Sequence, residues 1–249
     1  MRQLLLRPVA IASVFLTGLT AVVSLSLLFP QRWLIEVLSL GICPGAVYFK
    51  ETEEKVIALT IDDSPDREST SQILEVLNKY QVKATFFPIS DRVLTHPELT
   101  QSIVAAGHEL GNHLTKDEPS ITLRSHFESE LQRADTILSR YDSVNWLRPG
   151  YGWCNKSMVQ TAQAYNYQVA LGSIWSYDTH LLSDKFASQF ILINAKPGSI
   201  VVLHDGGKRG INTAKTLETV IPQLQQQGYR FVTLSELQPK QNSLNLHTY

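Results

Sequence analysis

Seven polar residues of this chain carry the side chains that acid–base and metal-dependent hydrolysis require. Each comes at or shortly after the carboxyl end of a segment with the apolar, β-branched character of a buried strand. They are Asp62, Asp63, His113, Arg148, Asp178, His204 and Asp205. Active sites of α/β barrels are built at the carboxyl ends of the strands, so we expect these side chains to share one site.

The adjacent carboxylates Asp62 and Asp63 end the most clearly strand-like segment, 56–61 (VIALTI). Two neighbouring negative charges repel each other, so a cation or an arginine must stabilise them if they are buried. An Asp-Asp pair taken alone is more often a solvated turn, because Asp is mostly exposed. The other polar residues at the same rim favour the functional interpretation.

A metal site is one candidate for that stabilisation. His113 and Asp117 are four residues apart and would face the same way if HLTKD formed a helical turn. With Asp63 they provide one imidazole and two carboxylates, which leaves open positions for water and substrate on a metal. The competing role for Asp117 is to cap a helix that follows it.

The elements that must position these residues alternate along the chain after Lys50. Strands are expected at 56–61, 82–87, 108–112, 146–147, 168–172, 200–203 and 230–234. Helices are expected at 69–80, 97–106, 126–140, 157–164 and 214–226, and Pro222 should kink or divide the last of them. This alternation predicts an α/β fold with a parallel sheet, either open or barrel-shaped.

The N-terminal part differs in composition from the rest. Residues 8–28 carry no charge and are long enough to cross a bilayer, which takes roughly 20 residues. Arg2 and Arg7 precede the run, so we expect a single-pass membrane protein with its N-terminus in the cytoplasm and its catalytic part outside. A cleaved signal peptide is the alternative.

The expected organisation therefore has four parts. Residues 1–30 form the anchor or signal peptide, and 31–52 form a membrane-proximal segment and linker with Trp33 near the interface. Residues 53–238 form the catalytic domain, and 239–249 form a polar tail.

Composition excludes some functions and leaves others open. Acidic and basic residues nearly cancel, with a net charge of −1, so the chain has no electrostatic footprint for nucleic acid. A bridge between Cys43 and Cys154 is possible in an oxidising compartment. We expect the two to be unpaired, because Cys43 lies outside the motif region. The glycine-rich segment 206–210 (GGKRG) is expected to be a flexible solvated loop, and closure over an anionic substrate is the alternative.

Over residues 55–237 the chain resembles the NodB-homology polysaccharide deacetylases. Five segments carry the resemblance in the family's order: 60–65 (TIDDSP), 111–113 (GNH) with Asp117, 148–152 (RPGYG), 175–178 (WSYD) and 203–205 (LHD). The chain departs from the family pattern in three places. Asp117 replaces a histidine, Ser64 replaces a glycine, and the Asp-Trp that should follow Asp178 is absent.

The resemblance implies a deformed (β/α) barrel that hydrolyses N-acetyl groups of an amino-sugar polysaccharide such as peptidoglycan, a chitin-like polymer or an exopolysaccharide. The implied metal ligands are Asp63, His113 and Asp117. The implied metal is Zn²⁺, with Mn²⁺ or Co²⁺ also compatible because a second carboxylate makes the ligand set harder.

The same resemblance implies the remaining roles. Asp62 would be the general base and His204 the general acid. Arg148 would orient Asp62, and Asp178 would tune His204. The implied substrate-binding residues are Pro149, Tyr151, whose backbone would hold the oxyanion, and Leu203. Together with Trp175, Leu203 would replace the missing tryptophan in lining the acetyl pocket.

Two other functions fit the departures from the family motifs. One is a non-catalytic glycan-binding or scaffold protein on the same fold, and the other is an amidohydrolase of a small non-sugar amide. A Ser-His-Asp hydrolase is disfavoured, because the sequence contains no GxSxG motif.

Overall fold

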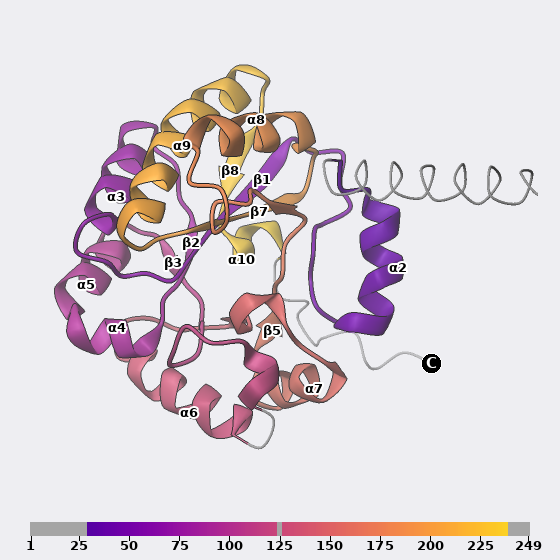
Figure 1. Ribbon diagram of the computed structural model, residues 1–249, viewed down its shortest axis with the longest axis vertical. Coiled ribbons are helices and arrows are strands. Elements are labelled where there is room, and N and C mark those ends of the chain that lie inside the picture. The colour runs from indigo at the N-terminus through magenta and orange to yellow at the C-terminus, as the bar shows by residue number, and fades with distance from the viewer. Residues whose placement is uncertain (1–28, 124–125, 239–249) are drawn as a thin grey trace, which may run out of the picture.

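The computed structural model describes residues 29–123 and 126–238 as a mixed α/β fold with parallel strands at its centre (Figure 1). The expected α/β class is confirmed. Residues 8–28 and 239–249 lie outside the described part, so the expected membrane span and polar tail are not tested. Within the described ranges, no helix combines the length and the apolar character needed to cross a membrane.

The main sheet is built around β1 (Val56–Asp62), and its neighbours follow the order β3-β2-β1-β7-β6. All of these pairs are parallel. The other strands of the order are β2 (Thr85–Phe87), β3 (Glu109–Leu110), β6 (Ile174–Trp175) and β7 (Ser199–His204). Strand β8 (Arg230–Val232) pairs with the first half of β1. Strands β4 (Trp146–Leu147) and β5 (Gln168–Val169) form a second parallel pair, which a bridge between Asn112 and Leu147 joins to the end of β3.

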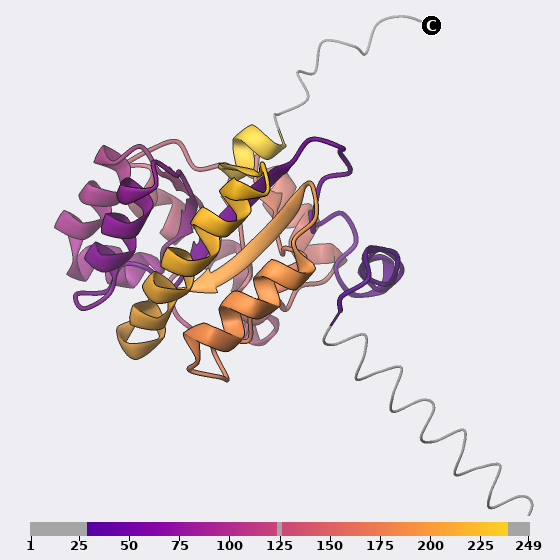
Figure 2. The ribbon, with the colours of Figure 1, turned by 90° about the horizontal axis from the view of Figure 1, so that it is seen from above.

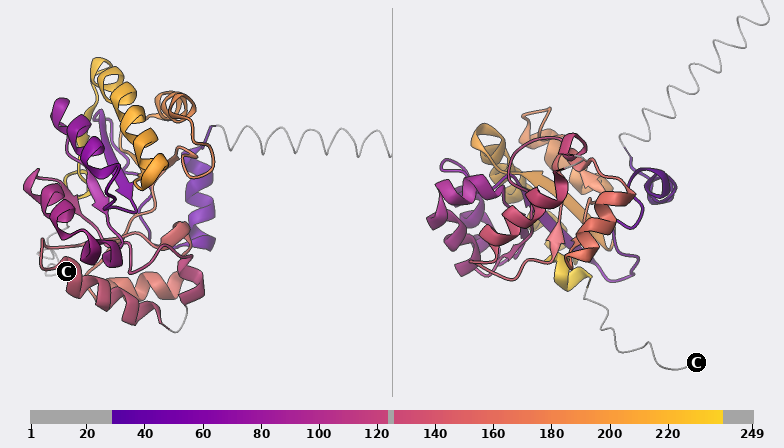
Figure 3. Two further views of the ribbon diagram at one scale, coloured as in Figure 1. Left: turned by 60° about the vertical axis from the view of Figure 1, so that its left-hand side comes forward. Right: turned by 90° about the horizontal axis from the view of Figure 1, so that it is seen from below.

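Helices surround these strands. They are α2 (Arg32–Ile42), α3 (Thr70–Lys79), α4 (Ser90–Thr95), α5 (Pro97–Ala105), α6 (Phe127–Leu138), α7 (Lys156–Ala164), α8 (Asp184–Asn194), α9 (Gly207–Gln226) and α10 (Leu234–Leu237). Helices α8 and α9 lie side by side beside β7 (Figure 2). Figure 3 shows α2 at the margin of the domain. The sequence expectations missed α4, α8, α10 and β6, which are short or lack a clear apolar period.

Strand β1 is buried along its whole length because both of its faces are covered. Ile57, Leu59 and Ile61 pack into the core that contains residues of α3, α5 and α9. Val56 and Ala58 point to the opposite face, where they meet Trp146 and α10. Successive side chains of a strand alternate between faces, so Thr60 and Asp62 point to this second face as well.

The expectation of a flexible loop at 206–210 is wrong, because α9 begins at Gly207 and runs without interruption to Gln226. Pro222 does not divide this helix. A proline has no N–H to donate to the carbonyl oxygen four residues earlier, which here is that of Glu218. The hydroxyl of Tyr80 donates to that oxygen at 3.3 Å and so replaces part of the lost bond.

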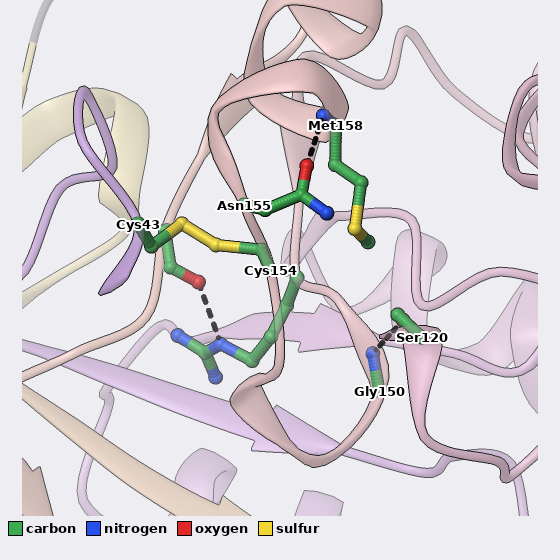
Figure 4. Close-up of a disulfide and its surroundings, with 8 residues drawn as sticks. Cys43, Ser120, Gly150, Cys154, Asn155 and Met158 are labelled. Atoms are coloured by element: carbon green, nitrogen blue, oxygen red, sulfur yellow. Dashed lines mark hydrogen bonds between the residues drawn. A yellow bond between two sulfur atoms is a disulfide. The ribbon is translucent and has the colours of Figure 1, made fainter. Parts of the chain in front are cut away.

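The expectation of two unpaired cysteines is also wrong, because Cys43 and Cys154 form a disulfide (Figure 4). Their Cα atoms lie 5.4 Å apart although 111 residues separate them in the chain. Both side chains are buried in one apolar cluster with Met158 and Val159. The bridge therefore ties the end of α2 to the segment that leads into α7.

Removing the disulfide should lower the free energy of unfolding by about 2–5 kcal/mol, since a crosslink that closes a loop of this length restricts the unfolded chain. The double variant Cys43→Ala with Cys154→Ala tests this by urea unfolding. Reduced wild-type protein is the matched control and should resemble the variant. A loss below about 1 kcal/mol in both would contradict the prediction.

His108 should make the fold sensitive to mild acid. The ring is buried, and its Nδ1 accepts the backbone N–H of Ala84 at 3.2 Å. Burial, with a smaller effect of the nearby Lys83 charge, lowers the pKa of His108 from 6.5 to about 4. The folded state therefore favours the neutral form of the His108 ring. Its contribution is fully present above pH 6.5 and is lost as the pH falls toward 4.

We expect protonation of His108 to lower the free energy of unfolding by on the order of 3 kcal/mol as the pH falls through that interval. Urea unfolding at about pH 7.5 and about pH 4.5 measures the loss, and His108→Asn is the comparison because an amide oxygen can accept the same N–H without titrating. The variant should lose clearly less stability between the two pH values than the wild type. Equal losses would contradict the assignment to His108.

Candidate active site

A cavity of about 430 Å³ opens at the carboxyl ends of the central strands. Its polar lining consists of Asp62, Asp63, His113, Asp117, Arg148, Asp178, Thr179, His180, His204 and Arg209. Its less polar lining includes Leu171, Trp175, Tyr177, Val202 and Tyr151. Six of the seven rim residues that the sequence singled out meet here. Asp205 does not, because it is fully buried where the hydroxyls of Ser69 and Thr70 donate to it.

Asp62 is the last residue of β1, and its carboxylate is held by Arg148, which directly follows β4. Arg148 Nη1 donates to Asp62 Oδ1 at 2.7 Å and to the hydroxyl of Thr60 at 2.7 Å. The Arg148 Nε donates to the carbonyl of Ala170 at 3.0 Å. Both charged residues are almost completely buried. The strand parity that directs Thr60 and Asp62 to one face therefore gives Arg148 two partners there.

His204 ends β7 and lies opposite Asp62 in the register of the two parallel strands. Its Nδ1 is 3.0 Å from Asp178 Oδ1, and its backbone N–H donates to Asp178 Oδ2 at 2.8 Å. Its Nε2 is 3.9 Å from Asp62 Oδ2. Burial lowers the pKa of His204, but the hydrogen bond to Asp178 and the charges of the neighbouring carboxylates outweigh burial and raise the pKa above its ordinary value.

Asp63 faces three cationic or titratable groups. Its Oδ2 accepts a hydrogen bond from Arg209 Nη2 at 2.6 Å, and its Oδ1 is 3.4 Å from His113 Nε2. The Nδ1 of His113 donates to the carbonyl of Arg148 at 2.7 Å. Burial raises the pKa of Asp63, but the hydrogen bond to His113 and the charges of His113, His204 and Arg209 hold the pKa well below its usual range.

Asp117 does not complete a metal site with Asp63 and His113. The helical turn over 113–117 that would align His113 and Asp117 does not form, because the segment is irregular and Leu114 has a positive φ of 64°. Asp117 is partly exposed, and its Oδ2 lies 3.8 Å from Arg92 Nη2. Among the described residues, no group of three or more His, Cys, Asp or Glu side chains is placed to hold a metal ion.

The donors that are present do not fit the expected three-ligand site. Asp63 and His113 approach each other, but the remaining Asp63 oxygen is hydrogen-bonded to a guanidinium and the third ligand is paired with another arginine.

Two of the three residues expected to bind substrate are not in the cavity wall. Leu203 is fully buried in the core on the other face of β7, and its neighbour Val202 lines the cavity in its place. Pro149 is buried and is not part of the lining, whereas Tyr151 is. Strand alternation explains the first correction, because His204 and Val202 share a face that Leu203 does not.

The backbone around the cavity is held in unusual conformations. Asp63, Leu114, Tyr151 and Tyr177 all have positive φ values between 58° and 65°, which are uncommon outside glycine. The loop that carries Tyr151 is fixed by Gly150, whose N–H donates to the hydroxyl of Ser120 at 2.6 Å (Figure 4). A Cβ at Gly150 would lie 2.2 Å from the carbonyl oxygen of Glu118, so only glycine allows this approach. Strain of this kind tends to gather at functional sites.

The site residues that sequence reasoning missed are Arg92 and Arg209. Arg209 lies in the first turn of α9, and Arg92 lies in α4, a helix that was not expected. The paired carboxylates Asp62 and Asp63 require a cation, and an arginine can supply it. The residue spacing does not indicate which arginine balances their charge.

Comparison with known proteins agrees with this fold. A polysaccharide deacetylase family model matches residues 49–170. A peptidoglycan-N-acetylglucosamine deacetylase of Bacillus cereus is 36% identical over 193 residues, which cover 74% of this chain and 88% of that protein.

Two solved structures have the same fold. The Bc1960 peptidoglycan N-acetylglucosamine deacetylase superposes with a TM-score of 0.74 at 28% identity, over 78% of this chain and 92% of that one. BA3943 of Bacillus anthracis, described as a CE4 family pseudoenzyme, superposes with a TM-score of 0.72 at 27% identity, over 79% of this chain and 69% of that one. The chain belongs to the polysaccharide deacetylase family of the NodB-homology, or CE4, type.

Proposed function

We propose that this protein hydrolyses N-acetyl groups of an amino-sugar polysaccharide, and that its substrate is peptidoglycan. The observation that carries the proposal is the pair Asp62 and His204, which lie 3.9 Å apart on neighbouring strands and line one cavity. Arg148 holds the first and Asp178 holds the second. Family membership and the names of the relatives support the substrate class.

In this mechanism Asp62 is the general base. Arg148 holds the orientation of its carboxylate, so that Asp62 can take a proton from the water that attacks the acetyl carbonyl. The strained turn at Tyr151 lines the same cavity, and the backbone N–H of Tyr151 would stabilise the oxyanion. The neighbouring N–H groups of Gly150 and Gly152 already donate to Ser120 and Pro149.

His204 is the general acid. Its raised pKa favours the protonated ring, and Asp178 fixes the orientation of that ring through Nδ1. As the carbon–nitrogen bond breaks, Nε2 gives its proton to the departing sugar nitrogen, and the products are acetate and the free amine. Trp175 and Tyr177 provide aromatic surface in the cavity wall against which a sugar ring can pack.

Acetate release tests the proposal. Purified protein should release acetate from peptidoglycan and more slowly from chito-oligosaccharides, and mass spectrometry should locate the loss on the glycan amino sugars. Release only from small non-sugar N-acetyl amides would favour the amidohydrolase alternative. No release from any of these substrates, with or without added divalent metals, would contradict the proposal.

A non-catalytic glycan-binding protein is the second candidate. It is favoured by the incomplete ligand set at Asp63 and by the similarity to a structure described as a pseudoenzyme. Binding to peptidoglycan without acetate release would support this candidate over the first.

We further propose that the chain is held at a membrane, with its catalytic domain outside the cytoplasm. The apolar run 8–28 supports this, as does the outer face of α2, where Trp33, Val37 and Leu40 are 63%, 59% and 76% exposed. These residues recur at helical spacing and would lie at the bilayer interface. The full chain should fractionate with membranes, and a variant without residues 1–30 should not. Equal release of both into the soluble fraction would contradict this.

A further inference from the structure

We propose that the guanidinium of Arg209 takes the place of a divalent metal beside Asp63, and so makes the site a poor metal binder until that guanidinium is removed. The inference concerns what balances the charge of Asp63 and is independent of the substrate.

Asp63 has little capacity left for a metal ion. Its side chain is 4% exposed, one carboxylate oxygen bonds Arg209 Nη2 at 2.6 Å, and the other faces His113 at 3.4 Å. The backbone oxygen of Asp63 accepts a hydrogen bond from Arg92 Nη1. A cation that used both carboxylate oxygens would have to displace the Arg209 guanidinium from a buried ion pair.

Arg209 is held in this position from a second side. Its Nε donates to the backbone carbonyl of Asp205 at 3.0 Å, and Asp205 is itself fixed by Ser69 and Thr70. The Arg209 side chain is 22% exposed, so it is not a free surface side chain. Gly206 leaves room for the two arginines, because a Cβ there would lie 3.3 Å from Arg209 Nη2 and 3.5 Å from Arg92 Nη1.

The third expected ligand is occupied in the same way. Asp117 lies 3.8 Å from Arg92, so each carboxylate of the expected ligand set faces an arginine. Two guanidinium groups beside a would-be metal position oppose a dication by charge repulsion as well as by occupying its ligands. An arginine can also supply the fixed positive charge that two adjacent carboxylates need.

Metal binding tests the proposal without reference to activity. Isothermal titration with ZnCl₂ and elemental analysis after gel filtration should show little retained zinc in the full wild-type chain. Arg209→Ala should bind zinc at least about tenfold more tightly and retain a single equivalent. Zinc should also raise the melting temperature of Arg209→Ala but not that of the wild type.

Three matched variants make the result specific. Lys208→Ala removes the neighbouring positive charge outside the cavity and should behave like wild type. Arg209→Lys keeps a cation and should remain a weak zinc binder. Adding Asp63→Ala to Arg209→Ala should abolish the gain. Circular dichroism without metal checks that each variant is folded.

Tight binding of one zinc by the wild type, or zinc affinity that Arg209→Ala does not increase, would overturn the proposal. These measurements contain no substrate, so they are distinguishable from a failure of the proposed deacetylase function, which only the acetate assay reports.

Discussion

Asp62→Asn should lower the rate of acetate release on the order of 10²–10⁴-fold, because general-base catalysis by this carboxylate depends on its capacity to take a proton. The amide has nearly the same shape and can still accept the hydrogen bond that Arg148 Nη1 now donates at 2.7 Å. The cavity and the Arg148 position should therefore be preserved while the base is lost.

The loss should appear in kcat with little change in KM, since the substitution removes an interaction that matters in the transition state. Asp142→Asn, which makes the same change at an exposed acid outside the cavity, should leave the rate unchanged. An Asp62→Asn variant within tenfold of the wild-type rate would show that another group is the base.

The fold class could be predicted because its signals are local. The apolar run at 56–61 is continuous because β1 is covered on both faces, and Asp62 follows directly because the strand ends at the cavity. The amphipathic spacing of their sequences predicted helices α6 and α7. The shared rim of Asp62, His113 and His204 then followed from parallel strand geometry.

Other features depend on contacts between distant segments, so the sequence did not predict them. The disulfide requires α2 to dock beside α7, and Arg209 reaches Asp63 only because α9 begins at Gly207. A helical turn would have aligned Asp117 with His113, but the left-handed conformation of Leu114 redirects the chain. In each of these cases tertiary packing outweighs the local propensity of the sequence.

One error was avoidable from the sequence. His204 and Leu203 are both expected at the site, although adjacent residues of a strand point to opposite faces. The register pairs Thr60 with Val202 and Asp62 with His204, so the even-numbered residues of both strands face the cavity side. Strand parity, applied to the motif residues, would have selected Val202.

Arg148→Met should destabilise the fold by about 3–5 kcal/mol and remove most of the activity, because it leaves Asp62 as an unpaired buried charge. Methionine fills similar space but cannot donate to Asp62, Thr60 or the carbonyl of Ala170. It also loses the position of the guanidinium 4.3 Å from the Phe87 ring centre. Urea unfolding measures the stability, and Arg140→Met, at an exposed arginine, should change it by less than about 0.5 kcal/mol.

A second substitution separates the buried charge from the lost packing. If the unpaired Asp62 carboxylate causes most of the destabilisation, Arg148→Met combined with Asp62→Asn should recover about 1–3 kcal/mol relative to Arg148→Met alone, because a neutral amide is cheaper to bury. The double variant should remain inactive, since it lacks the base. Additive losses in the double variant would instead place the cost in the bonds to Thr60 and Ala170. Arg148 would then be a structural support of the strand ends, and the orientation of Asp62 would need another source.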